Sequence, residues 1–302
     1  MISHKNSIRL IKVASALIPF RKSRRDFRQH LNKKFRVDYK KNLQVQNYLK
    51  QYTELSNEGS TAEKILPKNL PIWQLWLQGA EQAPIIVKKC FNSVKEYSSG
   101  RNIVILDENN LLDYIDLPHY ILEKKKSGII SNTHFSDIVR ICLLEKYGGT
   151  WIDATVLFTD EIQDKILNAN FFAFYVPKDH PNYEFHAFSS WFMHAQPNQK
   201  ILKDIKQTLF NYWKHEDKLI DYFCLHFIAY NVIHSSNYHL SNWQSQAFLS
   251  NKEPHLLQDA LDEKFNMDTF NKIKGMSSVH KLTYKYRRII QHSFLDFIVH
   301  KL

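Results

Sequence analysis

The fold of this chain is decided by residues 131–155, which read SNTHFSDIVRICLLEKYGGTWIDAT. Residues 131–147 predict a helix, because apolar side chains recur at helical spacing and the glycines Gly148 and Gly149 follow as a C-terminal stop. Residues 150–158 are rich in β-branched and aromatic side chains and predict a strand. The stretch therefore predicts a helix that returns directly into a strand.

The same alternation extends outward over residues 67–176, and it predicts an α/β sheet with crossover helices. The region 184–235 is expected to be mostly helical, with helices over 198–213 and 217–233. The further elements that we expect are strands over 72–77 and 102–106 and helices over 84–97, 108–115 and 118–126.

The charge of the chain is concentrated at its beginning. The 302 residues carry a formal net charge of +11, yet residues 1–50 hold 14 Lys and Arg against two Asp and so carry +12. The rest of the chain carries −1. A linker composition around Asn57 and Gly59 places the boundary near residue 60. We therefore expect a basic helical arm over residues 1–60 and a near-neutral globular domain over 61–302.

The basic arm begins with residues 5–18, whose apolar and basic side chains lie on separate faces of a predicted amphipathic helix. Three interpretations stay open. The helix packs on the globular domain, or it docks on an anionic membrane surface, where each basic residue adds about 1 kcal/mol. The third is nucleic-acid binding, supported by the interleaved aromatics Phe20, Phe27, Phe35 and Tyr39 but not by any motif in the neutral domain.

The composition excludes several classes of protein. No run of 18 apolar residues is present, so no transmembrane helix is expected. The cysteines Cys90, Cys142 and Cys224 lie far apart, which argues against a disulfide scaffold or zinc site and fits a reducing cytosol. The chain has no GxGxxG, GxxxxGK[ST], GxSxG or HExxH motif, so dinucleotide binding, P-loop and hydrolase chemistry lack support.

Three charged residues mark the candidate site. Asp153 follows the apolar core of its strand, and in open α/β sheets ligands bind beyond the carboxyl ends of the strands. Asp137 and Arg140 stand three residues apart, on one face of an otherwise core-seeking helix. On spacing alone, an ordinary intrahelical ion pair explains Asp137 and Arg140.

The full string over 134–155 resembles a known family. Its S-D-x-x-R, Y-G-G and W-I-D-A-T motifs are similar to those of bacterial capsular polysaccharide synthesis proteins, relatives of glycosyltransferase family 32 and, more distantly, of glucosylating toxins. The resemblance covers residues 65–160. It implies a GT-A-like fold, meaning a Rossmann-like mixed sheet with flanking helices, here with a helical C-terminal part.

The resemblance also implies an activity. It is the transfer of a sugar from a nucleotide-sugar donor to a glycan or polyprenyl-linked acceptor in capsular or cell-surface polysaccharide synthesis, with the anomer retained. In the family, Asp137 and Arg140 match residues that reach the donor sugar, and Asp153 matches the first aspartate of a DxD motif. These three are the expected catalytic residues.

A divalent cation, Mn²⁺ or Mg²⁺, is part of the same expectation, with Asp153, Thr155 and His280 as its ligands. Thr155 stands where the second DxD aspartate is usual, and a neutral hydroxyl is a weaker ligand than a carboxylate. A non-catalytic subunit of a polysaccharide synthesis complex is therefore an alternative. For His280, a place in a basic surface tail is equally open.

The resemblance places donor contacts along the chain. For the aromatic ones, a place in the core is the competing interpretation, as it is for residues 188–192, which we consider as an acceptor-side wall. The expected donor-binding residues are Trp73, Gln74, Asp107, His134, Ser136, Asp137, Arg140, Gly149 and Lys281.

The family places the basic arm at a membrane. Lipid-linked glycans are built at the inner leaflet, so we expect a cytoplasmic protein that is peripheral on the inner face of the cell membrane. Nucleic acid is not an expected partner of the transferase.

Overall fold

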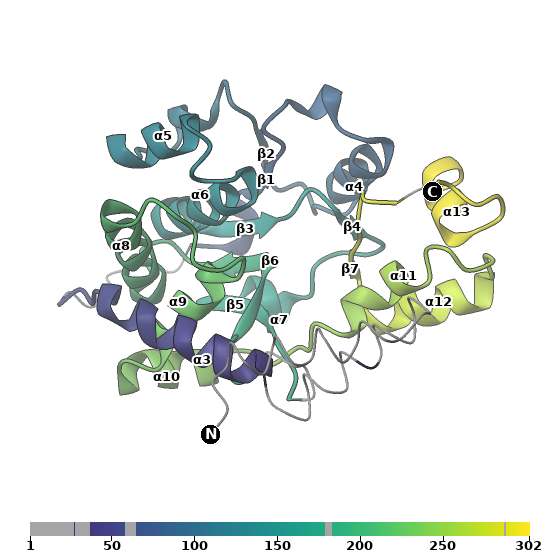
Figure 1. Ribbon diagram of the computed structural model, residues 1–302. Helices are drawn as coiled ribbons and strands as arrows, with labels where there is room; N and C mark the ends of the chain where they lie inside the picture. The colour runs from purple at the N-terminus through teal and green to yellow at the C-terminus, as the bar shows by residue number, and fades with distance from the viewer. Residues whose placement is uncertain (1–26, 28–36, 58–64, 179–182, 287) are drawn as a thin grey trace. The chain divides into compact units, whose positions relative to one another are not determined.

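The computed structural model describes residue 27 and residues 37–57, 65–178, 183–286 and 288–302 (Figure 1). The chain divides into two compact units, Met1–Gln51 and Tyr52–Leu302. The predicted helix over 5–18 lies outside the described residues, and the first unit contributes helix α3 (Val37–Leu49). No helix in the described part of the chain has both the length and the apolar character to cross a bilayer.

The second unit is built on a mixed five-stranded sheet in the order β2-β1-β3-β6-β5. The strands β1, β2 and β3 run parallel, β6 is antiparallel to β3, and β5 is antiparallel to β6. The predicted mixed α/β sheet is thereby confirmed. The strands are β1 (Ile72–Leu75), β2 (Ile103–Leu106), β3 (Gly149–Ile152), β5 (Phe171–Tyr175) and β6 (Phe188–Ala195).

A second, two-stranded sheet pairs β4 (Val156–Phe158) with β7 (Val279–Lys281). The prediction of one continuous strand over 150–158 is therefore wrong. The chain leaves the large sheet after Ile152 and turns, with the Val156 amide donating to the Asp153 carbonyl (3.0 Å). The turn at residues 153–155 connects the two sheets. The pairing of β4 with β7 then brings β7, which comes late in the chain, close to these residues.

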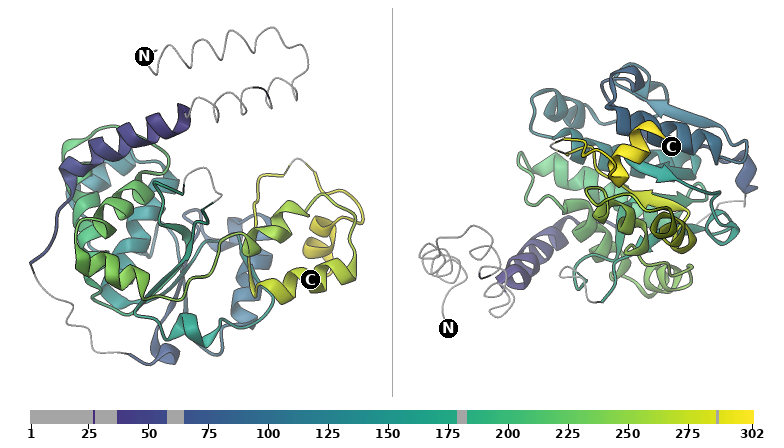
Figure 2. Two further views of the ribbon diagram at one scale, coloured as in Figure 1. Left: turned by 90° about the horizontal axis from the view of Figure 1, so that it is seen from below. Right: turned by 90° about the vertical axis from the view of Figure 1, so that its right-hand side faces the viewer.

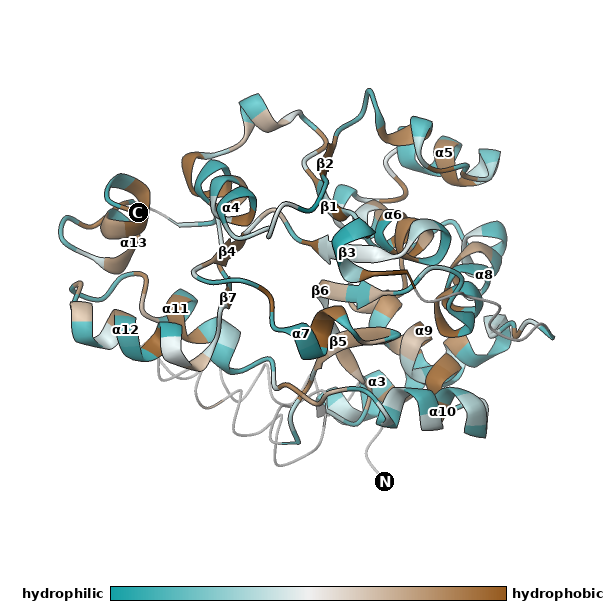
Figure 3. Ribbon diagram, turned by 180° about the vertical axis from the view of Figure 1, so that it is seen from behind, coloured by the Kyte–Doolittle hydropathy of each residue, from teal (hydrophilic) through white to brown (hydrophobic). Residues whose placement is uncertain are grey.

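Helices pack against the large sheet and also lie beside the small sheet (Figure 2). Helices α6, α8 and α9 pack in succession, while α11 contacts β7, and α4 contacts both β4 and α13. The strands are largely hydrophobic and the outer turns of several helices hydrophilic (Figure 3). The helices are α4 (Ile85–Glu96), α5 (His119–Lys126), α6 (Asn132–Tyr147), α7 (Asp164–Leu167), α8 (Lys200–His215), α9 (Cys224–Ile233), α10 (Asn237–Gln244), α11 (Leu256–Asp259), α12 (Met267–Met276) and α13 (Phe294–His300).

Short 3-10 helices complete the element order. The predicted helix over 108–115 is reduced to one of them, so that prediction is wrong in type and extent. The 3-10 segments are Lys50–Tyr52, Pro67–Asn69, Ala80–Gln82, Leu111–Asp113 and Glu253–His255.

The expectation of a mostly helical region over 184–235 fails at β6. All eight residues of β6 are buried, so the strand has no polar face and lacks the alternation by which a strand is recognised. Helix α8 confirms the predicted helix over 198–213, whereas the predicted helix over 217–233 begins only at Cys224.

Two glycines fix the passage from α6 into β3. Gly148 and Gly149 have φ values of +64° and +100°. A Cβ atom on Gly149 would lie 2.3 Å from the Pro71 carbonyl oxygen, and one on Gly148 would lie 2.6 Å from the Pro197 nitrogen. No side chain fits there, so both positions require glycine for space as well as for conformation.

A buried polar chain joins three strands or strand ends across the sheet. The Arg101 guanidinium donates to the Thr150 hydroxyl oxygen (2.8 Å), which lies 2.9 Å from His194 Nδ1. Because arginine only donates, the single hydroxyl proton of Thr150 is free for His194, whose Nδ1 then accepts. Burial, and next the Arg101 charge, lower the pKa of His194 to about 3.

This neutral histidine predicts acid sensitivity. The folded-state pKa lies below the usual 6.5, so the stabilisation is present above pH 6.5 and is lost as pH falls toward 3. The free energy of unfolding should fall by about 2 kcal/mol between pH 7 and pH 5 from this group. Urea unfolding of His194→Gln should show a correspondingly smaller pH dependence. His119→Gln, at an exposed histidine, is the control, and equal pH dependence in all three proteins would contradict the assignment.

Candidate active site

The site begins where β3 leaves the large sheet. The Asp153 backbone amide donates to the Trp191 carbonyl of β6 (2.9 Å), which anchors the residue at the sheet edge. Its carboxylate Oδ1 accepts from Trp151 Nε1 (3.0 Å), and 24% of the side chain is exposed. Asp153 therefore presents a fixed and partly accessible carboxylate at the carboxyl end of a parallel strand.

Helix α6 supplies the second carboxylate and the cation between them. Arg140 Nη2 lies 3.1 Å from Asp137 Oδ1 and 3.4 Å from Asp153 Oδ1. The Asp137 and Arg140 side chains are buried. One guanidinium thus joins a carboxylate of the helix to a carboxylate of the strand end, which is more than an intrahelical ion pair.

Arg140 also contacts Ser136, Ser190 and Trp151. Its Nε donates to the Ser136 carbonyl (3.3 Å), and its Nη2 lies 3.1 Å from Ser136 Oγ. Its Nη1 donates to the Ser190 carbonyl, and the guanidinium lies over the Trp151 ring at 5.0 Å. These partners fit a residue that positions the two carboxylates, and a contact of Arg140 with the donor sugar stays a prediction.

Lys281 approaches Asp153 from the small sheet. Its Nζ lies 3.0 Å from Asp153 Oδ2 and 2.6 Å from Thr155 Oγ1. Burial raises the pKa of Asp153, but the charges of Lys281 and Arg140 outweigh it and hold the pKa below its usual range. Asp153 is therefore ionised at neutral pH.

We call Asp137, Arg140, Asp153, Thr155 and Lys281 the charged cluster. Two further predicted residues border it. Ser136 accepts from Arg140 as described above, and His134 Nδ1 lies 3.4 Å from Asp137 Oδ2, with its ring 5.4 Å from that of Trp213. The structure thus brings seven of the sequence-predicted site residues together.

Three predicted residues take other places. His280 precedes Lys281 in β7 and so points to the opposite face, where Nε2 lies 2.9 Å from Thr159 Oγ1. Gly149 lies at the other end of β3, in the tight approach to Pro71. Trp73 is buried and donates from Nε1 to the Gly148 carbonyl (2.8 Å), so its place is in the core.

The carboxyl ends of β1 and β2 carry the other predicted donor contacts. Gln74 is fully buried, and neither polar atom of its side chain has a hydrogen-bond partner among the described residues. Trp76 Nε1 is likewise unpartnered within the described chain, and its ring meets the edge of Tyr284 at 5.5 Å. Asp107 Oδ1 accepts from the amides of Asn109 (2.7 Å) and Asn110 (3.2 Å).

Two neighbours of the charged cluster were missed by the sequence analysis. Partial burial, and then the charges of Asp137 and Asp153, raise the pKa of Tyr222. Burial lowers the pKa of His226 to about 4, against the nearby Asp137 carboxylate. Both lie in the 217–233 region, where no local motif signals proximity to a site more than 60 residues earlier in the chain.

The residues expected to bind Mn²⁺ or Mg²⁺ have other partners in the part of the chain that the structure describes. Within the described ranges, no group of three or more His, Cys, Asp or Glu side chains could hold a metal ion. The two oxygens expected to bind the cation, on Asp153 and Thr155, both contact the Lys281 ammonium instead. No step of the chemistry below is therefore assigned to a metal.

Comparison with known proteins gives three findings. The sequence pattern described as capsular polysaccharide synthesis protein matches residues 20–298. Among solved structures, the chain is similar to one titled PaToxG Glycosyltransferase, with 14% identity, a TM-score of 0.39, and coverage of 82% of this chain and 95% of that chain. No curated protein matches the chain.

Proposed function

The chain belongs to the capsular polysaccharide synthesis family, as its motifs predict, and we propose that it is a glycosyltransferase that uses a nucleotide-sugar donor. The acceptor in this proposal is a glycan or a polyprenyl-linked glycan. The observation that carries it is the joining of Asp137 and Asp153 by Arg140, at the sheet edge where α/β folds bind ligands.

The charged cluster suits the recognition of a sugar. An ionised carboxylate only accepts hydrogen bonds, and sugar hydroxyls are donors that carboxylates hold strongly. Asp153, with its exposed edge, would contact donor hydroxyls directly, and Asp137 would complete the set. Arg140 holds both carboxylates in place.

The unpartnered polar groups at the end of β1 suit the nucleotide base. A buried amide without partners costs about 1–3 kcal/mol, and a base edge offers both a donor and an acceptor to Gln74. Trp76 and Tyr284 would flank this position with aromatic surface, and Asp107 would accept from the ribose.

The acceptor would approach from the side of α9. Tyr222, which is 64% exposed just before α9, provides aromatic surface there. His226, neutral at physiological pH, can exchange a proton with a hydroxyl. Retention of the anomeric configuration is part of the proposal, and its support is the family resemblance.

The site assignment predicts the behaviour of two variants. Asp153→Asn removes the charge but keeps the shape, and Arg140→Lys keeps the charge but loses the planar fork that joins the carboxylates. Each should lower turnover of the productive nucleotide sugar by roughly two to three orders of magnitude. Hydrolysis or transfer is measured over a panel of nucleotide sugars, with circular dichroism as the check on folding.

Asp160→Asn, just beyond β4, removes the same charge away from the cluster and should leave turnover unchanged. Near-normal turnover in folded Asp153→Asn would contradict the site. Failure of the wild type to turn over any donor in the panel would contradict the transferase function.

The basic arm would hold the enzyme on the inner face of the cell membrane. Its support is the charge of +12 over residues 1–50, set against a domain of almost no net charge. Each basic residue near an anionic surface adds about 1 kcal/mol of binding free energy, so five basic residues together make the difference between weak and stable attachment of the arm.

Neutralising part of the arm in the full-length chain tests this attachment. Binding to vesicles that contain roughly 30% anionic phosphatidylglycerol should weaken about tenfold or more, while donor turnover should be unchanged. The substitutions to Gln are at Arg21, Lys22, Arg24, Arg25 and Arg28. Five domain lysines changed to Gln serve as the control, at Lys178, Lys214, Lys218, Lys272 and Lys301. Equal loss in both variants, or tighter salt-dependent binding to DNA than to vesicles, would contradict the membrane role.

A further inference from the structure

The position of Lys281 bears on how the enzyme would stabilise the negative charge of the leaving diphosphate. In an Asp-x-Asp motif, the first and third side chains offer oxygens to a divalent cation. Here those positions are Asp153 and Thr155, and Lys281 Nζ contacts both, at 3.0 Å and 2.6 Å. We propose that the Lys281 ammonium replaces the divalent cation, so that the enzyme transfers sugar without a metal.

The charge balance of the cluster supports this replacement. Asp137 and Asp153 bring two negative charges, and Arg140 and Lys281 bring two positive charges, so the cluster is neutral before donor binds. A divalent cation placed there would meet no net negative charge and would have to displace a partly buried ammonium that already contacts Asp153 and Thr155. An aspartate at position 155 would change that balance, whereas Thr155 keeps it.

The strand pairing holds Lys281 in place. In the small sheet Lys281 pairs with Val156, and the Leu282 amide donates to the Thr155 carbonyl (2.8 Å). The turn at 153–155 and the lysine are therefore fixed to the same backbone. An ammonium has three N–H donors, and the two contacts leave one for an oxygen of the donor diphosphate.

The inference rests on the proposed transferase function and supplies its electrostatics. In the transfer, the bond between the anomeric carbon and the diphosphate oxygen breaks, and the bonding pair leaves with the diphosphate. The acceptor oxygen bonds to the anomeric carbon and releases its proton to water. Lys281 stabilises the added negative charge on the leaving diphosphate, which is the electrostatic contribution that a metal would otherwise make.

Two measurements test the replacement in the full-length protein. Turnover of wild type should be unchanged by EDTA, while Lys281→Ala should lose about 100-fold or more. Electron paramagnetic resonance of Mn²⁺, with UDP or GDP present, should show no ordered binding to wild type. The double variant Thr155→Asp with Lys281→Ala should gain Mn²⁺ binding. Lys272→Ala, at an exposed lysine of α12, is the control and should match wild type.

The outcomes separate the two proposals. Turnover that EDTA abolishes and Mn²⁺ restores would overturn the role of Lys281 and leave the transferase function standing. Ordered Mn²⁺ binding by wild type with nucleotide would overturn it even without turnover. Absence of any donor turnover counts against the transferase function alone, because the Mn²⁺ measurement is independent of it.

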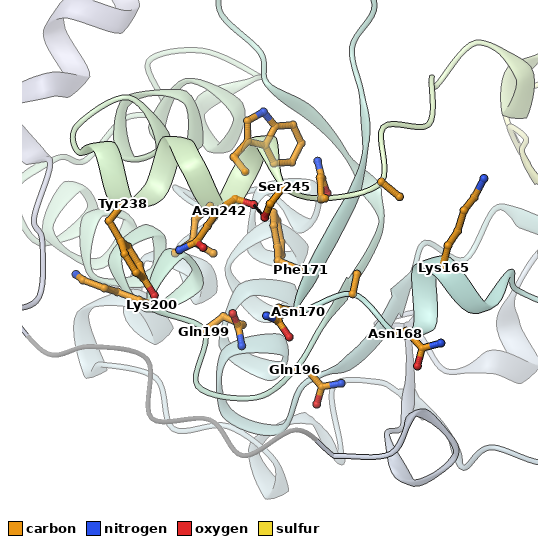
Figure 4. Close-up of a pocket in the computed structure, with 15 residues that line it drawn as sticks. Lys165, Asn168, Asn170, Phe171, Gln196, Gln199, Lys200, Tyr238, Asn242 and Ser245 are labelled. Carbon is orange, nitrogen blue, oxygen red and sulfur yellow. Dashed lines mark hydrogen bonds between the residues drawn. The ribbon is translucent and has the colours of Figure 1, made fainter.

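A separate observation concerns the opposite edge of the large sheet. A cavity of about 430 Å³ lies between the start of β5, the end of β6 and helices α8 and α10 (Figure 4). Along β6, Gln196 in its wall is five residues from Trp191, which contacts Asp153, a span of about 16 Å. The cavity is therefore distinct from the charged cluster.

The wall of this cavity combines amides with aromatic rings. Among its described residues none is acidic, and the aromatic members are Phe171, Tyr238 and Trp243. The side-chain amide of Gln196 pairs with the backbone of Ile65. Its Oε1 accepts from the Ile65 amide (2.9 Å), and its Nε2 donates to the Ile65 carbonyl (3.1 Å). The wall contains six carboxamide side chains, on Asn168, Asn170, Gln196, Gln199, Asn242 and Gln246.

Unused hydrogen-bonding capacity remains in this wall. Gln246 is 9% exposed, and its Oε1 accepts from the Ala173 amide (3.1 Å), but its Nε2 has no partner within the described chain. Carboxamides both donate and accept, as sugar hydroxyls do, and flat rings pack against the apolar faces of sugars. The volume lies in the range of small-ligand sites, about 300–1,000 Å³.

From this chemistry we infer that the cavity is a second carbohydrate site, which binds an oligosaccharide away from the point of transfer. A glycosyltransferase that extends a chain would hold an earlier part of that chain there. The ligand class follows from the proposed function, but the binding itself does not depend on turnover. Lys165 at the rim would favour acidic sugars.

Saturation-transfer NMR on the full-length protein tests the cavity with maltoheptaose, chitohexaose and a hyaluronan hexasaccharide as probes. At least one probe should bind wild type, and Asn242→Ala and Tyr238→Ala should weaken its binding about fivefold or more. Both residues are exposed on α10, so folding should survive. Asn237→Ala removes the same side chain from the same helix outside the cavity wall and is the control.

Donor hydrolysis without acceptor should be unchanged in Asn242→Ala and Tyr238→Ala, and Asp153→Asn should still bind the probe. Binding of none of the probes to wild type would overturn the second site. So would binding that survives both cavity variants, or binding that is lost in Asp153→Asn, since the probe would then occupy the charged cluster.

Discussion

The structure depends on one buried guanidinium. Arg140 joins a carboxylate of α6 to a carboxylate at the end of β3, and the burial of Arg140 and Asp137 makes the contact hard to replace. Removing one partner from a buried ion pair costs about 3–5 kcal/mol, because the other charge is left without compensation. The helix and the strand end are therefore locked to each other at the level of single atoms, and the site needs that precision.

The second constraint is the turn at residues 153–155, which passes the chain from the large sheet to the small one. Because β4 pairs with β7, a lysine 128 residues after Asp153 is delivered to its carboxylate. The charged cluster thus combines one continuous stretch, residues 137–155, with the distant Lys281, and it assembles only when both sheets have formed. Gly148 and Gly149, which admit no side chain, fix the start of this path.

Local signals predicted the part of the site that lies within one continuous stretch. Helix α6, its glycine stop and the strand that follows are encoded by spacing and composition over residues 131–152. Spacing alone explained Asp137 and Arg140 as an ion pair, and the family resemblance assigned them, together with Asp153, to the site. The strand β6 was missed because it is buried on both faces and has no polar alternation. Between His280 and Lys281, only strand alternation in the folded sheet decides which side chain meets Asp153. Tyr222 and His226 reach the site through tertiary packing that no local pattern encodes.

The antiparallel course of β6 relates the two ends of the large sheet. In the middle of β6, the Ser190 and Trp191 carbonyls accept from Arg140 and from the Asp153 amide. Just past the carboxyl end of β6, Gln196 enters the wall of the amide-lined cavity. A single buried strand, held on both sides by β3 and β5, therefore sets the separation between the charged cluster and the cavity. A glycan that occupied both would have to follow the protein surface from one sheet edge to the other, so its length, rather than any single sugar contact, would decide whether both sites are filled at once.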